Sequence, residues 1–381
     1  MSQISFLMIL CLVQLFTNFI DSSLRVWLLI LLETFFSLLL YFIVIAMSED
    51  LRRILEELKQ MRESLMHMFL ALEKRIDDVL WYNVLGDVAR IFKFRMVGPP
   101  PSKVQKPNAP GARNPVIFWS YVFLPKDLDK SEKYPLIVLP HGGVHANMST
   151  ASANIVRELL AQGYLVIAPE YRGSTGYGKV FYELIDYGGL EIEDTHAARN
   201  WMVENCRYVD PNRVGIVGWS HGGLHALMNI FFYPDDYKAA YAGVPVSDLI
   251  MRMGYKGQNY RDLFIAGYHI GVDVCDNVEE YRRRSPVHYV DRLKTPLLIH
   301  TTTNDEDVSY LEVLNLINAL KAAGKEFEYK IFKEAPGGHV FARIDTLFAR
   351  EVRAEIYSFL AKYLHPKRPL TSADELNPFE L

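Results

Sequence analysis

The chain contains little cysteine and little net charge, and each shortage excludes a class of protein. Its three cysteines, Cys11, Cys206 and Cys275, are scattered and have neither the spacing of metal ligands nor that of a disulfide framework. The formal net charge is only −4 over 381 residues, so a nucleic-acid partner is not expected. No other motif indicates a metal site or a cofactor, and we expect neither.

A serine between two glycines is the most informative motif that is present. Residues 214–217 are apolar, Gly218 and Gly222 stand two positions before and after Ser220, and residues 224–228 have the composition of a helix. A sharp turn from a strand into a helix strains the serine backbone, and the glycines remove side chains that would collide there. The motif predicts a nucleophile elbow with its serine at the carboxyl edge of a parallel sheet.

A serine hydroxyl needs a general base, and an acid and a histidine follow the serine in the order that such a site requires. Residues 295–300 have the pattern of a buried strand, and the loop after them carries Asp305 and Asp307. We predict that Asp305 is the acid and keep Asp307 as the alternative. Residues 327–332 alternate like a strand and lead through a glycine-rich loop to His339, the predicted base.

The oxyanion of an acyl-transfer intermediate needs hydrogen-bond donors. One is expected from the backbone N–H of His221, the residue after the nucleophile. The second is expected from the loop His141-Gly142-Gly143, which follows the apolar residues 136–140. A tight turn without a catalytic part is the alternative reading of this loop.

Four separated segments resemble, in the same order, the catalytic domain of the prolyl oligopeptidase family of serine peptidases, which includes dipeptidyl and acylaminoacyl peptidases. The segments are His141-Gly142-Gly143, Tyr171-Arg172-Gly173-Ser174-Thr175-Gly176-Tyr177-Gly178, residues 209–220 and Ser285-Pro286-Val287-His288-Tyr289-Val290. The resemblance runs from about residue 116 to 364 and implies an α/β-hydrolase fold. It puts Ser220, Asp305 and His339 at the family's triad positions. It also puts His141 where some members have an oxyanion-hole tyrosine.

The resemblance has limits. Family members usually carry a large β-propeller that screens substrates by size, and we expect none in this chain. The acidic residues with which dipeptidyl members hold a substrate amino terminus usually lie in that part, so dipeptide release is not implied.

An irregular stretch inside the hydrolase region, residues 251–289, is rich in tyrosine and arginine. We expect it to act as a cap that shapes the substrate pocket; ordinary core packing is the alternative. The predicted pocket residues are Trp219, Tyr171, Tyr260 and Phe264.

Residues 1–47 are expected to anchor the chain in a membrane through one or two transmembrane helices. Residues 26–47 form an apolar run long enough for the ~20 residues that cross a bilayer, whereas residues 4–20 are a shorter and more polar run. Four basic residues follow the second run within residues 52–62, against Arg25 alone in the loop between the runs. This bias puts the hydrolase on the cytoplasmic side.

Residues 48–80 have a heptad pattern. Leucine or valine recurs every seven residues, and an apolar residue follows three positions after the first three of them. The positions are Leu51, Leu58, Leu65, Leu72 and Val79, with Ile54, Met61 and Met68. We expect a coiled coil that makes the protein a homo-oligomer; a helix packed on the membrane surface or on the hydrolase is the alternative.

Prolines and changes in the sequence pattern divide the rest of the chain into three parts. Prolines indicate an extended linker over residues 81–115, alternating strand and helix patterns indicate an α/β-hydrolase domain over residues 116–365, and residues 366–381 read as a polar tail. The expected strands are near 117–123, 135–140, 164–169, 213–218, 240–244, 295–300 and 326–333. The expected helices are near 150–162, 192–205, 222–232, 309–323 and 346–364.

Together these features predict a membrane-anchored serine hydrolase that acts through an acyl-enzyme, preferably on short or unfolded peptides. A carboxylesterase or lipase-like enzyme acting on acyl esters would use the same residues. A catalytically idle membrane scaffold is the third hypothesis, and the intact triad argues against it.

Overall fold

The computed structural model of the protein describes residues 31, 34–35, 49–104 and 107–378. The chain divides into two compact units, residues 1–66 and 67–381. The two predicted membrane segments fall almost entirely outside the described residues. Within the described part, no helix combines the length and the apolar character needed to cross a membrane.

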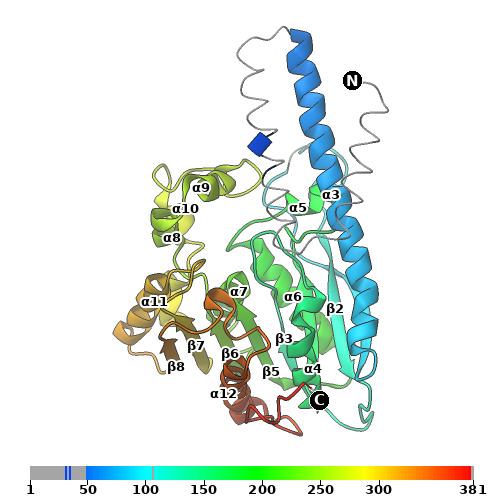
Figure 1. The fold of residues 1–381 in the computed structure, drawn as a ribbon, viewed down its shortest axis with the longest axis vertical. Helices are drawn as coiled ribbons and strands as arrows, with labels where there is room; N and C mark the ends of the chain where they lie inside the picture. The colour runs from blue at the N-terminus through cyan, green and yellow to red at the C-terminus, as the bar shows by residue number, and fades with distance from the viewer. Residues whose placement is uncertain (1–30, 32–33, 36–48, 105–106, 379–381) are drawn as a thin grey trace. The chain divides into compact units, whose positions relative to one another are not determined.

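The second unit is built on one eight-stranded mixed sheet (Figure 1). Its strands are β1 (Ala89–Val97), β2 (Ile117–Pro125), β3 (Tyr134–Val138), β4 (Leu165–Glu170), β5 (Val209–Trp219), β6 (Ala239–Gly243), β7 (Leu297–Thr302) and β8 (Glu328–Phe332). The spatial order is β1-β2-β4-β3-β5-β6-β7-β8. Strand β2 is antiparallel to both neighbours, and the strands from β4 to β8 pair in parallel. This mixed sheet is consistent with the predicted α/β-hydrolase fold.

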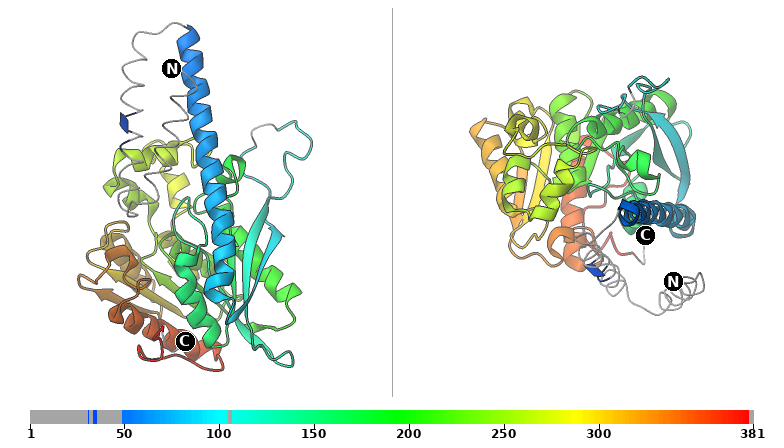
Figure 2. Two further views of the ribbon diagram at one scale, coloured as in Figure 1. Left: turned by 45° about the vertical axis from the view of Figure 1, so that its right-hand side comes forward. Right: turned by 90° about the horizontal axis from the view of Figure 1, so that it is seen from above.

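Helices cover both faces of the sheet (Figure 2). The longer ones are α3 (Glu49–Leu85), α4 (Ala153–Ala161), α6 (Leu190–Asn205), α7 (His221–Phe232), α11 (Tyr310–Ala322) and α12 (Leu347–Leu364). The shorter ones are α5 (Lys179–Tyr182), α8 (Leu249–Tyr255), α9 (Gln258–Ile265) and α10 (Val278–Arg282), with 3₁₀ turns at Thr150–Ser152, Pro286–Arg292 and Gly338–Val340. Helices α6, α7 and α11 share one hydrophobic core. Helices α4 and α12 and the end of α3 share the other.

Two predicted segments, residues 251–289 and 81–115, differ from the structure. The stretch 251–289 is not irregular but forms α8, α9 and α10. The linker predicted for residues 81–115 is wrong at its start, because α3 continues to Leu85 and residues 89–97 form β1, paired along its whole length with β2. Trp81 and Leu85 are fully buried. The prolines after residue 98 suggested a spacer, but the pairing partner that makes β1 a strand lies about 20 residues further along the chain.

The segments before and after the predicted hydrolase domain also pack on it or form hydrogen bonds with it. In the proline-rich loop, Lys103 donates to the carbonyl oxygens of Gly267 and Ile270 at 3.0 Å each. In the predicted tail, Leu376 is 1% exposed and the backbone N–H of Arg368 donates to the Gln162 carbonyl. The folded unit therefore extends at both ends beyond residues 116–365, the range predicted for the hydrolase domain.

The heptad positions of α3 point to solvent in this single chain. All eight side chains are between 41% and 67% exposed. They are Leu51, Ile54, Leu58, Met61, Leu65, Met68, Leu72 and Val79. Within the second unit a different face of the helix, which includes Lys74 and Trp81, is buried. Self-association through the heptad face remains a prediction.

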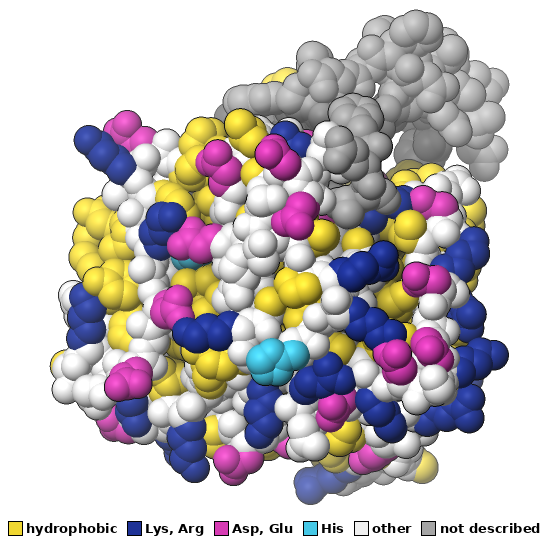
Figure 3. Space-filling model, turned by 90° about the horizontal axis from the view of Figure 1, so that it is seen from below, with side chains coloured by type: hydrophobic (Ala, Val, Ile, Leu, Met, Phe, Trp, Pro, Cys, Tyr) yellow, Lys and Arg dark blue, Asp and Glu magenta, His cyan; other side chains and the backbone are white. Residues whose placement is uncertain are grey.

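Figure 3 shows one face of the molecule on which basic and acidic side chains are interspersed. The small net charge of the sequence thus corresponds there to a mixed surface.

Candidate active site

Ser220 joins β5 to α7 in a backbone conformation that side chains rarely adopt. Its φ is 60° and its ψ is −121°. The turn is held by hydrogen bonds, since the Ser220 N–H donates to Gly243 O at 2.9 Å and its carbonyl accepts from Leu224 N at 3.1 Å. Such strain costs on the order of 1–3 kcal/mol and persists only where the surroundings enforce it. It is the geometry predicted for a nucleophile elbow.

The two glycines of the motif are required by close approach. A Cβ atom added at Gly218 would overlap the Gly222 carbonyl, and one added at Gly222 would overlap the Pro140 carbonyl. The elbow therefore packs against the end of β3, and the loop after β3 lies beside the serine.

The structure brings Asp305 and His339 together. Asp305 lies in the loop after β7, and both of its carboxylate oxygens are 2.9 Å from His339 Nδ1, in the loop after β8. The Asp305 side chain is fully buried. Oδ1 also accepts the backbone N–H groups of Asp307 at 2.9 Å and Val308 at 2.8 Å, so the acid is held in a fixed orientation.

Asp307, the alternative acid, has a different environment. Its side chain is 43% exposed and lies 3.6 Å from His339 Nε2. It pairs with Lys256 Nζ at 2.5 Å and Arg252 Nη2 at 3.1 Å. Hydrogen bonding to Lys256 and the charge of Arg252 hold the pKa of this carboxyl below its usual range, although burial opposes them.

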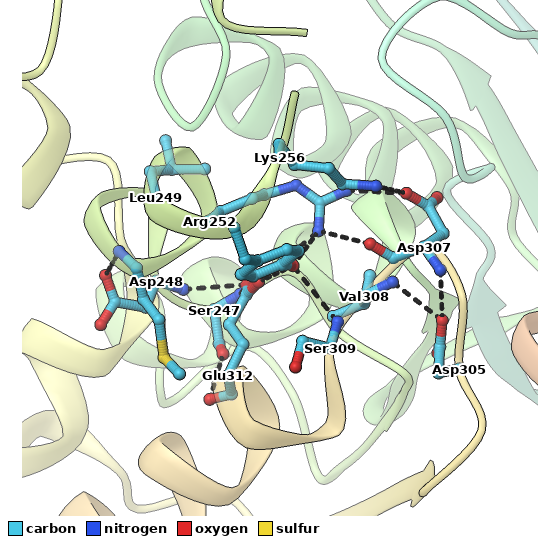
Figure 4. A network of polar contacts seen from close by, with 12 residues as sticks. Ser247, Asp248, Leu249, Arg252, Lys256, Asp305, Asp307, Val308, Ser309 and Glu312 are labelled. Carbon is cyan, nitrogen blue, oxygen red and sulfur yellow. Dashed lines mark hydrogen bonds and ion pairs between the residues drawn. The ribbon is translucent and has the colours of Figure 1, made fainter. Parts of the chain in front are cut away.

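Arg252 connects the acid loop to the segment predicted to be a cap. It reaches from α8 toward Asp307 and toward the buried Glu312 of α11 (Figure 4). Tyr260 of α9 accepts a hydrogen bond from Arg252 Nε at 2.8 Å, and the Tyr255 hydroxyl donates to Glu312 at 2.5 Å. The cap and the acid loop are thus one hydrogen-bonded assembly.

The predicted oxyanion loop lies against the nucleophile. A Cβ added at Gly142 would be 3.4 Å from Ser220 Cβ. The ring of His141 is held away from solvent by two neighbours. Ser174 Oγ lies 2.8 Å from Nε2, and the Tyr171 hydroxyl lies 3.0 Å from Nδ1. The Ser174 hydroxyl also donates to the Tyr171 carbonyl. Burial lowers the pKa of His141, which favours the neutral ring, and Nδ1 also lies 3.0 Å from the Gly142 carbonyl oxygen.

Arg343 is a residue of this region that sequence reasoning missed. Its Nη2 donates to the His339 carbonyl at 3.0 Å, and its Nη1 would be 3.9 Å from a Cβ at Gly142. Burial lowers its pKa. Its guanidinium therefore lies between the loop of the histidine and the predicted oxyanion loop. An arginine four positions after a histidine gives no signal by itself.

The four predicted pocket residues lie in three places. Phe264 is fully buried and packs on Tyr187 and Tyr260. Trp219 is 5% exposed and packs on Tyr241. Tyr171 is fully buried, and its ring faces histidines: His141, His221 and His225. Its environment is that of a core residue.

A second cluster adjoins the elbow. Glu191, His221 and His225 are all buried, and one potential metal-ligand atom from each lies within 4.8 Å of the others. The sequence contains a signal for two of these three residues, because histidines four apart on a helix share a face. The carboxylate comes from another helix, and its approach depends on the fold.

Comparison with known proteins gives the same picture of the fold. A model of the prolyl oligopeptidase family matches residues 151–367. Two similar curated proteins are the uncharacterized peptidase YuxL of Bacillus subtilis (30% identical over 217 residues, 56% of this chain and 32% of that protein) and the acylamino-acid-releasing enzyme of Mus musculus (28% over 234 residues, 60% and 31%). The chain spans about a third of the length of these relatives.

Solved structures agree. A puromycin-hydrolyzing peptidase of Mycobacterium tuberculosis has a TM-score of 0.59 at 26% identity, over 74% of this chain and 40% of that one. An acylaminoacyl peptidase of Pyrococcus horikoshii has a TM-score of 0.60 at 19% identity, over 77% and 45%, and shows the likeness of fold alone. Because the family model covers more than half of the residues, this chain belongs to the prolyl oligopeptidase family of serine peptidases.

Proposed function

We propose that the protein is a serine hydrolase that forms an acyl-enzyme on Ser220 and acts as a peptidase on short or unfolded peptides. The observation that carries the proposal is the Ser220 backbone, whose φ of 60° stores strain at the start of α7 beside Gly142. Strain of this kind accompanies function more often than it accompanies packing.

The proposed roles follow from the contacts. His339 takes the Ser220 proton and returns it to the leaving group, and Asp305, bound to His339 Nδ1, fixes the tautomer and stabilises the imidazolium. The oxyanion is proposed to accept hydrogen bonds from the backbone N–H of His221 and from the Gly142-Gly143 loop. Each such donor contributes about 3–4 kcal/mol to lowering the barrier.

The proposed substrate class rests on the family relationship. Relatives include acylamino-acid-releasing enzymes, and a neighbouring structure is that of a puromycin-hydrolyzing peptidase. The cap of α8 and α9, tied to the acid loop through Arg252, is proposed to select substrates. An esterase would use the same triad and is the second candidate.

The proposed location is a membrane. Its support is the apolar composition of residues 26–47, which is that of a spanning helix. The basic residues that follow favour a cytoplasmic hydrolase. Protease protection on sealed membranes tests this: digestion of the hydrolase from outside, without detergent, would contradict it.

Labelling with a fluorophosphonate probe tests the enzyme proposal. The full chain should be labelled stoichiometrically, and Ser220→Ala should lose the label while keeping its thermal transition. Ser247→Ala, which changes a buried serine outside the triad, is the matched control and should keep the label. A Ser220→Ala protein that is still labelled would point to another nucleophile, and an unlabelled wild type would support the idle scaffold. A paired panel of peptide amides and acyl esters then separates peptidase from esterase.

A further inference from the structure

Glu191, His221 and His225 gather three metal-ligating side chains beside the nucleophile elbow. Their exposed fractions are 0%, 1% and 0%. His221 and His225 are four residues apart at the start of α7, so their side chains project from one face of that helix. Glu191 comes from the first turn of α6. The arrangement joins the starts of two helices.

The hydrogen bonds of Thr195 leave one nitrogen of His225 with a lone pair. Thr195 Oγ1 lies 2.7 Å from His225 Nδ1 and 3.4 Å from the Glu191 carbonyl oxygen, so in the tautomer in which the hydroxyl donates to this carbonyl it accepts the Nδ1–H of His225. The neutral imidazole then has its acceptor lone pair on Nε2. This nitrogen is buried and has no hydrogen-bond partner among the residues that the structure describes.

His221 adds a second unsatisfied imidazole. Neither of its ring nitrogens has a hydrogen-bond partner within the described part of the chain, and Nε2 lies 3.7 Å from Glu191 Oε1. An unsatisfied buried polar group costs about 1–3 kcal/mol. The Glu191 carboxylate is oriented through both oxygens, because Oε1, the oxygen nearest to His221 Nε2, accepts the backbone N–H of Gly188 and Oε2 accepts that of Gly189.

We propose that Glu191, His221 and His225 bind one divalent transition-metal ion of the Zn²⁺ type, with a water molecule as the fourth ligand. Two imidazole nitrogens and a carboxylate are a ligand set that suits zinc. Bonds of about 2.0–2.2 Å in a tetrahedron put the ligand atoms roughly 3.4 Å apart. The Glu191–His221 separation of 3.7 Å is close to that value, and all three ligand atoms lie within 4.8 Å of one another, so binding of an ion requires the more distant ones to move closer.

The ion would stabilise the nucleophile elbow and would not take part in acyl transfer. It would tie the first turn of α7, whose first residue is His221, to the first turn of α6. The positive ends of both helices disfavour a bare cation, so the Glu191 carboxylate supplies the charge that makes binding favourable. The site does not depend on whether the protein is a peptidase.

Metal analysis of the full chain, purified without a histidine tag, tests the proposal. The protein is stripped with a chelator and titrated with Zn²⁺ or Co²⁺, and bound metal and the visible absorption of Co²⁺ are measured. We expect one ion per chain and the spectrum of a four-coordinate Co²⁺ site. Glu191→Gln and His225→Leu should each weaken Zn²⁺ binding at least 100-fold. Thr195→Val, which removes the group that orients His225, should weaken it about 10- to 100-fold.

Matched controls separate binding from folding. His300→Leu and Thr301→Val change a buried histidine and a buried threonine on β7 that also lack side-chain hydrogen-bond partners among the described residues. Both should keep wild-type affinity. His225→Cys replaces one ligand by a thiolate and should bind metal with a preference shifted toward Cd²⁺, a change that a structural role alone would not produce. A wild-type protein that binds no stoichiometric Zn²⁺ at micromolar concentration, or a His225→Leu protein with unchanged affinity, would overturn the proposal.

Discussion

Nζ of Lys74 on α3 lies 2.8 Å from Oε1 of Glu170 at the end of β4. Lys74 is 3% exposed and Glu170 is fully buried. Lys74 also donates to Asn147 Oδ1 at 3.2 Å and to the Met148 carbonyl. Glu170 accepts the Met148 N–H and lies 3.6 Å from His141 Nε2. Lys74, which comes from the helix that precedes the sheet, therefore holds the loop that carries the predicted oxyanion donors through hydrogen bonds and an ion pair.

Lys74→Met should destabilise the protein and slow it. The substitution leaves the Glu170 carboxylate buried without its cation, which costs about 3–5 kcal/mol, and it releases the loop from α3, so kcat should fall with little change in KM. Urea denaturation and steady-state kinetics on one substrate measure the two effects. Lys59→Met, on an exposed part of the same helix, is the control. Equal stability and kcat for the two variants would show that Lys74 does not hold the loop.

Asp305→Asn should reduce kcat far more than Asp307→Asn. Asparagine at position 305 keeps one acceptor oxygen, which the backbone N–H groups of Asp307 and Val308 hold, and its NH2 group then faces His339 Nδ1. This donor favours the wrong histidine tautomer, a change that costs about 10⁴-fold in related triads. Asp307 is 43% exposed and pairs mainly with Lys256 and Arg252, so its amide should cost less than about tenfold. Single-turnover acylation rates compare the variants directly. A larger loss at position 307 would make Asp307 the acid.

Local sequence patterns were enough to predict the parallel strands, the main helices and the nucleophile elbow. Gly218-x-Ser220-x-Gly222 has its meaning because strand, turn and helix follow within 15 residues. The order of the acid and the histidine along the chain similarly predicted which loops meet, since both follow parallel strands that end at the same edge.

Contacts between distant segments were not predictable in this way. Strand β1 exposes Phe92 as well as Arg90 and Arg95, so the burial of its side chains does not follow their polarity. Lys74 reads as one more charged helix residue, and only the fold shows that its neighbour is Glu170. The Glu191 carboxylate reaches His221 through the packing of α6 on α7, about 30 residues away in sequence.

Acid should destabilise the protein through buried histidines. Burial lowers the pKa of His145 to about 4 and that of His300 to about 3, against about 6.5 in an unfolded chain. Below pH 6.5 the unfolded state binds protons that the folded state does not, so this stability is present above pH 6.5 and is lost as the pH falls. At pH 5 the loss is about 2 kcal/mol for each histidine.

His300→Leu isolates one of these two contributions. Between pH 6 and 4.5 the free energy of unfolding of this variant should depend less steeply on pH than that of the wild type. The two slopes should differ by about 1.4 kcal/mol per pH unit, which corresponds to about one proton. Urea denaturation at a series of pH values measures the slope. His365→Asn, which changes an exposed histidine, should leave it unaltered. An unchanged slope in His300→Leu would mean that His300 protonates freely in the folded protein.

The exposed heptad face of α3 should make the protein an oligomer. Leu58 and Leu65 are 54% and 41% exposed in the single chain, and burying a leucine side chain contributes about 1.5–3 kcal/mol. Leu58→Gln with Leu65→Gln should therefore lower the oligomeric order, as measured by light scattering or mass photometry of the full chain in detergent. Met66→Gln changes a side chain of similar exposure, 43%, that lies off the heptad positions, and it should leave the assembly intact. Activity on a small ester should survive in all three proteins, because the proposed triad and Lys74 lie within residues 67–381. A monomeric wild type would rule out the heptad face as an interface between copies of this chain.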